Sequence, residues 1–397
     1  MPEASQESSE PRPPAAGSFG EAVAFLQQHT DVLVLSDAEG AAQVAVVPSM
    51  QGRVLTSTPT GPDGPSLGWI NRTLIASGDT LDHINPYGGE DRFWFGPEGG
   101  QFSIFFKPGD PFDLEHWFTP APIDTEPFDL AASDANHARF TRTMRLDNYA
   151  GTTFYVAVER EVRLLDRAAT EEALGLPLDP SIRLVAFASE NTIRNAGEAA
   201  WTPETGLLSI WILGMFNASP QTTVVIPFHE GPEETFGPVV NDAYFGKVPA
   251  DRLTAQDGVL FFKGDSRYRS KIGLTPARAK TILGSYDATN AVLTLVQYNK
   301  PDGLTRYVNS MWELQDEPYA GDVVNSYNDG PPRPGASQLG PFYELETSSP
   351  AAALAPGESL RHVHRTFHFQ GSEAALDALA RQTLGVSLDT IKTALNT

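Results

Sequence analysis

Phe342-Tyr343-Glu344-Leu345-Glu346-Thr347 is followed along the chain by Leu354-Ala355-Pro356-Gly357-Glu358-Ser359 and then by a run from Arg361 to Phe369. Adjacent proline and glycine mark a turn. The last run alternates, because successive side chains of a strand point to opposite faces. Its two faces carry His362, His364 and His368 on one side and Val363, Phe367 and Phe369 on the other. This stretch therefore predicts a strand, a turn and a final strand.

The same alternation recurs outward from this stretch. Three further sets of residues share a face at every second position: Phe102, Ile104 and Phe106; Phe154, Val156 and Val158; Leu293, Leu295 and Gln297. The 34 glycines and 32 prolines supply turns, as at Tyr87-Gly88-Gly89 and Asn328-Asp329-Gly330. No helical pattern intervenes between strands, as a parallel α/β sheet would require. The sequence predicts a mainly β fold of antiparallel sheets.

Short helices are expected near the two ends of the chain. Ser18-Phe19-Gly20-Glu21 fits a capping box, and residues 31–47 read as a pair of strands after the first helix. Two closing helices are predicted, with caps near Ser372 and Ser387. Residues 1–17, rich in Ser, Glu and Pro, are expected to form a disordered leader, and residues 18–397 a single domain.

Composition argues against several partners and chemistries. The formal net charge of −22 opposes binding to nucleic acid and to anionic membranes, which lysine and arginine promote. The absence of cysteine excludes disulfides, thiolate zinc sites and thiol catalysis. No apolar stretch approaches the roughly 20 residues that span a bilayer. A Gly-rich phosphate loop, a serine-nucleophile elbow and a zinc-protease helix are also missing, and we expect no cofactor.

The predicted leader, residues 1–17, bears on the cellular compartment in which we expect the protein. It resembles the tether that remains when an export signal or lipoprotein anchor is trimmed from a bacterial protein. We therefore expect an exported or periplasmic protein, with the cytoplasm as the alternative, because an ordinary frayed terminus explains the same residues. These patterns carry no signal for an oligomeric state.

Three segments, in the same order, resemble those of the galactose-mutarotase-like and aldose 1-epimerase superfamily. They are 47–54 (VPSMQGRV), 87–98 (YGGEDRFWFGPE) and 342–359 with its Leu-Ala-Pro-Gly-Glu turn. The resemblance implies a supersandwich of antiparallel sheets with a sugar-binding cleft, and hence a carbohydrate ligand. It indicates an uncharacterised branch of the superfamily and not a true mutarotase.

By this resemblance Glu346 takes the place of a catalytic base. Mutarotases open the sugar ring with a Glu that takes the anomeric proton and a His that protonates the ring oxygen. The stretch that corresponds to the family's histidine, residues 207–212, reads Leu-Leu-Ser-Ile-Trp-Ile and holds no His. Either another residue serves as the acid, or the site binds sugar without opening it.

The segment 83–101 is the first candidate for sugar binding. Sugars are held by aromatic rings and by charged or amide groups that bind neighbouring hydroxyls. His83, Arg92 and Glu98 provide that mixture. A core strand of aromatic residues flanked by a surface salt bridge explains the same pattern.

Two more segments carry candidates for ligand binding. Trp312 and Glu313 follow a run of carboxamides and hydroxyls, which suits hydroxyl recognition and Asx-turns equally. Lys263 and Lys271 bound the one basic cluster of an acidic chain. That cluster suggests an anionic group on the ligand, such as a uronate, sulfate or phosphate. A solvated hairpin is the alternative.

Metal binding and glycoside cleavage are two further possibilities. His362 and His364 have a metal-ligand spacing, but no third ligand is fixed by spacing, and we expect no metal. Glycoside cleavage needs two carboxyl groups about 5 to 9 Å apart. The sequence offers four residues for such a pair: Glu98, Glu313, Glu344 and Glu346.

The sequence thus predicts a carbohydrate-active protein with a mutarotase-like cleft and epimerase chemistry in which Glu346 is the base. The alternatives are a non-catalytic glycan-binding protein, or a glycoside hydrolase or lyase on the same fold. A third alternative is a purely structural β-sandwich. Convergence of Arg92, Glu98, Trp312 and Glu346 on one concave face would argue against the structural alternative.

Overall fold

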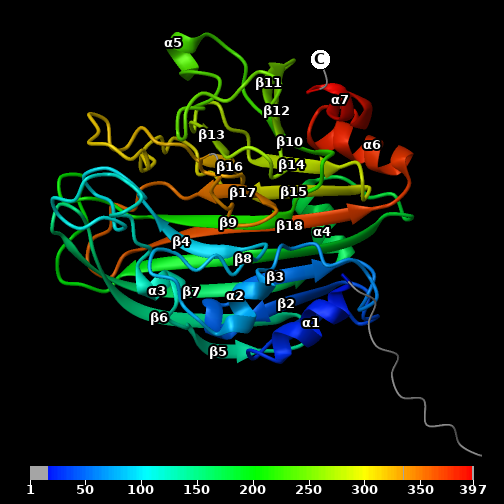
Figure 1. The fold of residues 1–397 in the computed structure, drawn as a ribbon, viewed down its shortest axis with the longest axis horizontal. Helices are drawn as coiled ribbons and strands as arrows, with labels where there is room; N and C mark the ends of the chain where they lie inside the picture. The colour runs from blue at the N-terminus through cyan, green and yellow to red at the C-terminus, as the bar shows by residue number, and fades with distance from the viewer. Residues whose placement is uncertain (1–16, 334, 396–397) are drawn as a thin grey trace, which may run out of the picture.

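Two layers of antiparallel strands make up the protein in the computed structural model (Figure 1). The structure describes residues 17–333 and 335–395. One layer is a ten-stranded sheet. The other holds a five-stranded and a three-stranded sheet, which touch where Val54 pairs with Asp91. The predicted mainly β, antiparallel architecture is confirmed, while the expected leader, residues 1–17, lies outside the described residues apart from Gly17.

The ten-stranded sheet runs through the middle of the chain to its last strand. Its order is β11 (Leu253–Gln256), β12 (Val259–Lys263), β10 (Thr222–Pro227), β14 (Ile282–Asp287), β15 (Val292–Tyr298), β18 (Ser359–Gln370), β8 (Arg183–Asn195), β7 (Thr153–Leu165), β6 (His137–Asp147) and β5 (Asp129–Ser133). Strand β7 buries every second residue, and the predicted set Phe154, Val156 and Val158 lies in the core.

The opposite layer brings distant parts of the chain together. The five-stranded sheet has the order β13 (Ser270–Leu274), β16 (Val324–Asn328), β17 (Phe342–Ser348), β9 (Ser209–Asn217) and β4 (Arg92–Gly96). The three-stranded sheet contains β1 (Leu33–Ser36), β2 (Gln43–Val47) and β3 (Arg53–Thr58). Strands β4 and β17 flank β9, so residues 252 positions apart become neighbours. Local sequence cannot encode that proximity.

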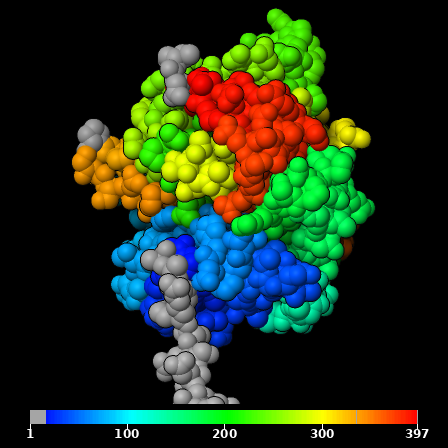
Figure 2. Space-filling view, turned by 90° about the vertical axis from the view of Figure 1, so that its right-hand side faces the viewer, coloured from blue at the N-terminus to red at the C-terminus, as the bar shows by residue number. Residues whose placement is uncertain are grey.

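The predicted terminal helices are present. They are α1 (Phe19–Gln27), α6 (Glu373–Thr383) and α7 (Leu388–Thr393), and their N-terminal amides bond to the side chains of Ser18, Ser372 and Ser387. Helices α6 and α7 share a hydrophobic cluster with Phe367 and Phe369 of β18, and Figure 2 shows them in red on the surface of the molecule. Among the described residues, no helix has both the length and the apolar character that crossing a membrane requires.

Five short helical segments in the connections were not predicted. They are the 3₁₀ helix η1 (Pro48–Met50), α2 (Arg72–Ser77), α3 (Ala121–Asp124), α4 (Arg167–Leu174) and α5 (Glu233–Phe236). Most are one or two turns long, too short for a periodic pattern to show in the sequence.

The strand expected at residues 102–106 is absent, and this prediction was wrong. The segment is a series of turns and bends. Ile104, Phe105 and Phe106 are all buried, whereas a strand would have sent Phe105 to the opposite face. Phe105 packs on Trp94 and Trp117 instead. The clustering of aromatic rings determines this segment, and the apparent alternation was coincidental.

The histidine face of β18 points between the layers and not to solvent. His362, His364 and His368 are fully buried. The Thr347 hydroxyl lies 2.8 Å from His362 Nε2 and 2.9 Å from His364 Nδ1, so it donates to one ring and accepts from the other. His368 Nε2 lies 3.0 Å from a carboxylate oxygen of Glu90. These contacts tie β18 to the opposite layer.

Acid should weaken this junction. Burial lowers the pKa of His362 to about 3, with a smaller contribution from His364, and burial lowers the pKa of His364 to about 4. Both rings are therefore neutral in the folded protein, while the unfolded chain gains protons below pH 6.5. The two neutral histidines make their full contribution to stability above pH 6.5. Their contribution to the free energy of unfolding falls as the pH falls toward 4, by about 2 kcal/mol per histidine at pH 5.

We therefore predict that the H362N/H364N double variant loses less stability than the parent between pH 7.5 and pH 5, measured by urea unfolding. The comparison is made between the two proteins because buried carboxyls of raised pKa, such as Glu344, change stability in the opposite direction. Replacing the exposed His29 by Asn serves as the control and should leave the parent's pH dependence intact. Equal losses in parent and double variant would contradict the prediction.

Candidate functional site

One face of the five-stranded sheet carries most of the polar side chains that the sequence indicated. In β17, Glu344 and Glu346 lie on this face, while Tyr343 and Leu345 pack into the core. Strand register sets the neighbours of the two glutamates: Met215 and Tyr327 beside Glu344, Leu213 and Asn325 beside Glu346, with Lys271 and Arg92 one strand further out on either side. Long-range pairing thus gathers the charges in one place.

Two buried ion pairs lie on this face. Arg92 Nη2 donates to Glu344 Oε1 at 3.1 Å, and Lys271 Nζ donates to Glu346 Oε2 at 3.1 Å. The Trp211 indole donates to the same Glu346 oxygen at 2.9 Å. Each of the four charged side chains is less than a tenth exposed. Water therefore screens these pairs only weakly, and their geometry is fixed by the strands that carry them.

Tryptophan rings surround the two pairs. The Arg92 guanidinium lies 4.1 Å from the Trp94 ring centre, and Lys271 Nζ lies 4.6 Å from that of Trp211. Further out, the rings of Trp117 and Trp312 stack with centres 5.8 Å apart. Cations over aromatic faces are stabilised by the ring quadrupole, and flat rings offer surfaces for the C–H faces of a sugar.

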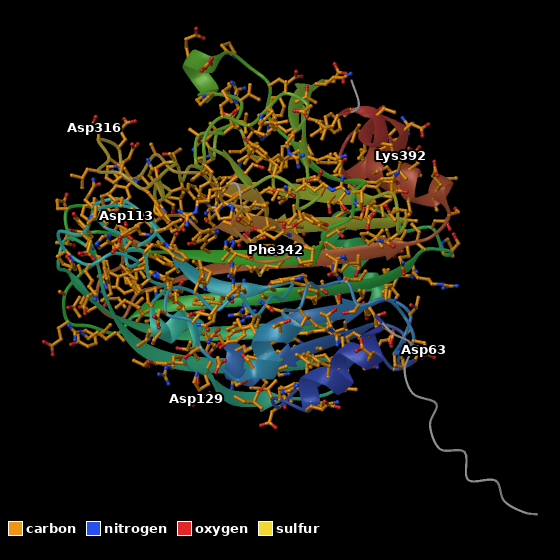
Figure 3. All side chains as sticks on the ribbon, viewed as in Figure 1. Asp63, Asp113, Asp129, Asp316, Phe342 and Lys392 are labelled. Atoms are coloured by element: carbon orange, nitrogen blue, oxygen red, sulfur yellow. The ribbon has the colours of Figure 1, made fainter. Side chains whose placement is uncertain are left out.

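A cleft opens over this sheet face in two connected parts. The inner cavity, about 90 Å³, is lined by Arg92, Lys271, Glu344 and the surrounding tryptophans. The outer cavity, about 470 Å³, is lined by His83 and Trp312 among others. Both share Ile84, Glu98, Trp117, Arg269, Tyr327 and Leu339. Asp113 and Asp316, on loops next to the outer cavity, lie on the same side of the molecule (Figure 3).

The cleft shifts the pKa values of its acidic groups. Burial raises the pKa of Glu344 to about 8, because the opposing effect of Arg92 is smaller. Burial also raises the pKa of Glu98, against the effect of Lys271. Burial lowers the pKa of Lys271, but Glu346 and Glu98 raise it more, so it lies above its ordinary value. Two carboxyl groups of raised pKa, Glu344 and Glu98, thus lie near the cations Arg92 and Lys271.

Several buried polar atoms of the cleft residues have no hydrogen-bond partner among the described residues. They are Nε and Nη1 of Arg92, the indole nitrogens of Trp94 and Trp117, and Oε1 of Glu346. Native proteins pair the large majority of their buried polar atoms. A cluster of unpaired donors around one cavity is typical of a site whose ligand supplies the missing acceptors.

The structure brings together six of the eight residues singled out from the sequence. His83, Arg92, Glu98, Lys271 and Trp312 line the cleft. Glu346 lies beneath it, fully buried behind Lys271 and Trp211.

The other two residues lie elsewhere. Lys263 ends β12 in the ten-stranded sheet, opposite Thr223, and lines neither cavity. Glu313 is exposed and lines neither cavity, although its neighbour Trp312 does. In the basic cluster that suggested an anionic ligand, the charge of Lys271 is balanced by Glu346.

Sequence reasoning did not select Trp211, Trp117, Arg269 or Glu344 as binding residues. Glu344 had a signal, because it shares a strand face with Glu346. Trp211 occupies the stretch where a histidine was sought, so its role could only be found by asking what replaces that histidine. Trp117 and Arg269 lie on loops whose positions depend on long-range packing.

The histidine pair does not have the surroundings of a metal centre. His362 and His364 share the hydroxyl of Thr347. Within residues 17–333 and 335–395, no group of three or more His, Asp and Glu side chains is arranged to hold a metal ion.

Solved structures share this architecture. The Slr1438 protein of Synechocystis sp. PCC 6803 matches with a TM-score of 0.51 and 13% identity, over 86% of this chain and 96% of that one. A candidate aldose 1-epimerase of Escherichia coli K12 matches with a TM-score of 0.50 and 12% identity, over 86% and 99%. A galactose mutarotase-like protein of Lactobacillus casei gives a TM-score of 0.47 and 11% identity, over 85% and 100%. The first two matches, with TM-scores of 0.50 or more, show that the chain has the fold of these proteins, as the resemblance implied.

Sequence comparison supplies the family. No curated protein sequence matches the chain. The model of a family of unknown function, DUF6786, matches residues 17–395, nearly the whole of the chain. This agrees with the expectation of an uncharacterised branch of the superfamily. By this match the chain belongs to the DUF6786 family.

Proposed function

We propose that the cleft binds a carbohydrate. The observation that carries the proposal is the convergence of Arg92, Lys271 and Glu344 with tryptophan rings around one cavity on a sheet face. Charged groups that bind neighbouring hydroxyls and rings that stack on C–H faces are the two requirements of sugar recognition. The galactose-mutarotase-like fold of the chain supports the same ligand class.

The unpaired donors favour a ligand rich in acceptor oxygens. Arg92 has two nitrogens without a partner, and Trp94 and Trp117 have one each. Hydroxyl and ring oxygens accept such bonds, so a sugar offsets the cost of leaving these donors buried and unpaired. Arg92 and Lys271 each contact one glutamate, which holds them in place for a ligand.

For catalysis we propose anomer exchange, with Glu98 as the proton donor and Glu346 as the base. Glu98 forms no ion pair among the described residues, lines both cavities and has a pKa raised by burial, which favours the protonated form that a proton donor needs. Glu346 takes its role from the superfamily resemblance. Its Oε1 has no partner and is the oxygen left to accept the anomeric proton, but Glu346 is fully buried, so Lys271 has to move aside for a sugar to reach it.

One observation favours the non-catalytic alternative, a glycan-binding protein. Glu346 is 0% exposed, and both Lys271 and Trp211 occupy one of its oxygens. In this arrangement the Glu346–Lys271 pair would fix the shape of the cavity and not transfer a proton. Glycoside cleavage is the remaining alternative, for which Glu98 and Glu344 supply two carboxyl groups of raised pKa in one cleft.

Binding is tested first. We predict that R92M weakens the affinity for the best ligand among the methyl glycosides of glucose, galactose and mannose by about tenfold or more. The reason is that the substitution removes the unpaired donors of Arg92 from the inner cavity. Isothermal titration calorimetry measures this change. The matched control is R142M, which removes an arginine paired with Glu126 outside both cavities and should bind like the parent. Failure of every glycoside to bind the parent, or unchanged binding by R92M, would refute the proposed site.

Catalysis is tested by anomer exchange, followed by polarimetry or NMR with the sugar that corresponds to the best glycoside. The proposed roles predict a rate loss of about a hundredfold or more in E98Q and in E346Q. E313Q, at an exposed glutamate outside both cavities, should keep the parent rate. Because the donor must be protonated, the rate should fall as the pH rises through the pKa of Glu98. A parent protein that binds the sugar without accelerating exchange is a binding protein and not an epimerase.

A further inference from the structure

The outer cavity differs in chemistry from the inner one. Its walls come from separate loops, and the surface that they present to the cavity is mainly apolar, with contributions from Ile84, Leu114, Trp117, Trp312, Pro332 and Leu339. At about 470 Å³ it is several times larger than the inner cavity and falls in the range of small-molecule sites. We call the charged surface that Arg92, Lys271 and Glu344 give to the inner cavity the charged floor. A monosaccharide bound there would leave most of the outer cavity empty.

Exposed apolar residues gather at this opening. Leu114 is 54% exposed and Leu339 is 46% exposed, and both line the outer cavity. Phe245, also exposed, lines the inner cavity. The exposed Phe118 stacks on His83, which lines the outer cavity, with ring centres 4.3 Å apart. Leucine left in water at a cavity rim favours an occupant that covers it.

Two charged groups lie where the two cavities meet. Glu98 and Arg269 line both parts of the cleft. The Arg269 guanidinium lies 3.7 Å from the Phe245 ring centre, and its Nε lies 3.3 Å from the Tyr327 hydroxyl. These contacts hold the guanidinium at the boundary. A ligand that crosses it would therefore present a polar part to the floor and an apolar part to the rim.

We infer that the ligand is a glycoside with an apolar aglycone, an alkyl or aryl group, whose sugar lies on the charged floor and whose aglycone fills the outer cavity. The inference rests on the proposed carbohydrate binding and names the ligand class for it. Because a glycoside has no free anomeric hydroxyl, this ligand class goes with the binding and glycoside-cleavage alternatives and not with anomer exchange. A longer oligosaccharide fits the outer cavity less well, because each added ring brings hydroxyls that the aliphatic walls from Ile84, Leu114 and Leu339 leave without partners.

The test is a series of glycosides that share the best sugar and differ only in aglycone: methyl, hexyl and octyl, each titrated by calorimetry below its critical micelle concentration. We expect the octyl glycoside to bind the parent at least about tenfold more tightly than the methyl glycoside, because each buried methylene adds favourable transfer free energy. In the L114S variant that gain should fall markedly, while affinity for the methyl glycoside stays at the parent value, because Leu114 lines the outer cavity and not the inner one.

Two controls distinguish binding of the aglycone in the outer cavity from nonspecific hydrophobic binding of the alkyl chain. L130S, at an exposed leucine of β5 outside both cavities, should keep the full octyl gain. An octyl chain on an ethylene-glycol head, which lacks a sugar, should bind much more weakly than the octyl glycoside.

The outcomes are distinguishable. Equal affinities for methyl and octyl glycosides would overturn the aglycone inference and leave the sugar site standing, whereas a panel in which no glycoside binds would overturn the proposed function itself. Tighter binding of an oligosaccharide than of the octyl glycoside would show that the outer cavity takes further sugar rings, which also overturns the inference. An octyl gain that survives in full in L114S would place the aglycone elsewhere.

Discussion

Lys271 and Glu346 meet at 3.1 Å almost out of contact with water, and Arg92 and Glu344 repeat this arrangement on nearby strands. Removing such charges from water costs several kcal/mol per ion, and their attraction offsets the cost only when the geometry is held firmly. The register of the five-stranded sheet holds it here, with Trp94 and Trp211 against the cations. The surrounding loops cover this charged sheet face, and its buried charges are stable only while the strands hold the ion pairs in this geometry.

The two ion pairs also determine what remains for a ligand. Arg92 and Lys271 each contact a glutamate, so part of their hydrogen-bonding capacity is used within the sheet. The nitrogens of Arg92 that have no partner are the donors left for a ligand. The proposed recognition depends on these local contacts and not on the overall charge of −22.

Much of the fold could be predicted from the sequence, because alternation and turn residues act locally. Phe154, Val156 and Val158 lie in the core, and Ser18, Ser372 and Ser387 cap the expected helices. The strand predicted at residues 102–106 was wrong, because apolar residues that pack in a cluster there happen to have the two-residue spacing of a strand. In the site, Arg92, Glu98 and Trp312 were found through their residue types. Trp117 and Arg269 could not be found, because only long-range pairing and loop packing bring them to the cleft.

Strand β17 has a consequence for how such proteins can diverge. Of its even-numbered residues, Glu344 lines the cleft and Glu346 lies beneath it, while Tyr343, Leu345 and Thr347 pack against the opposite layer. A shift of one residue in register would exchange the two sets, so strand pairing must be kept strictly. A substitution at Glu344 or Glu346 would also leave Arg92 or Lys271 buried without its partner. Ligand preference in this strand can therefore diverge only when both members of an ion pair change together.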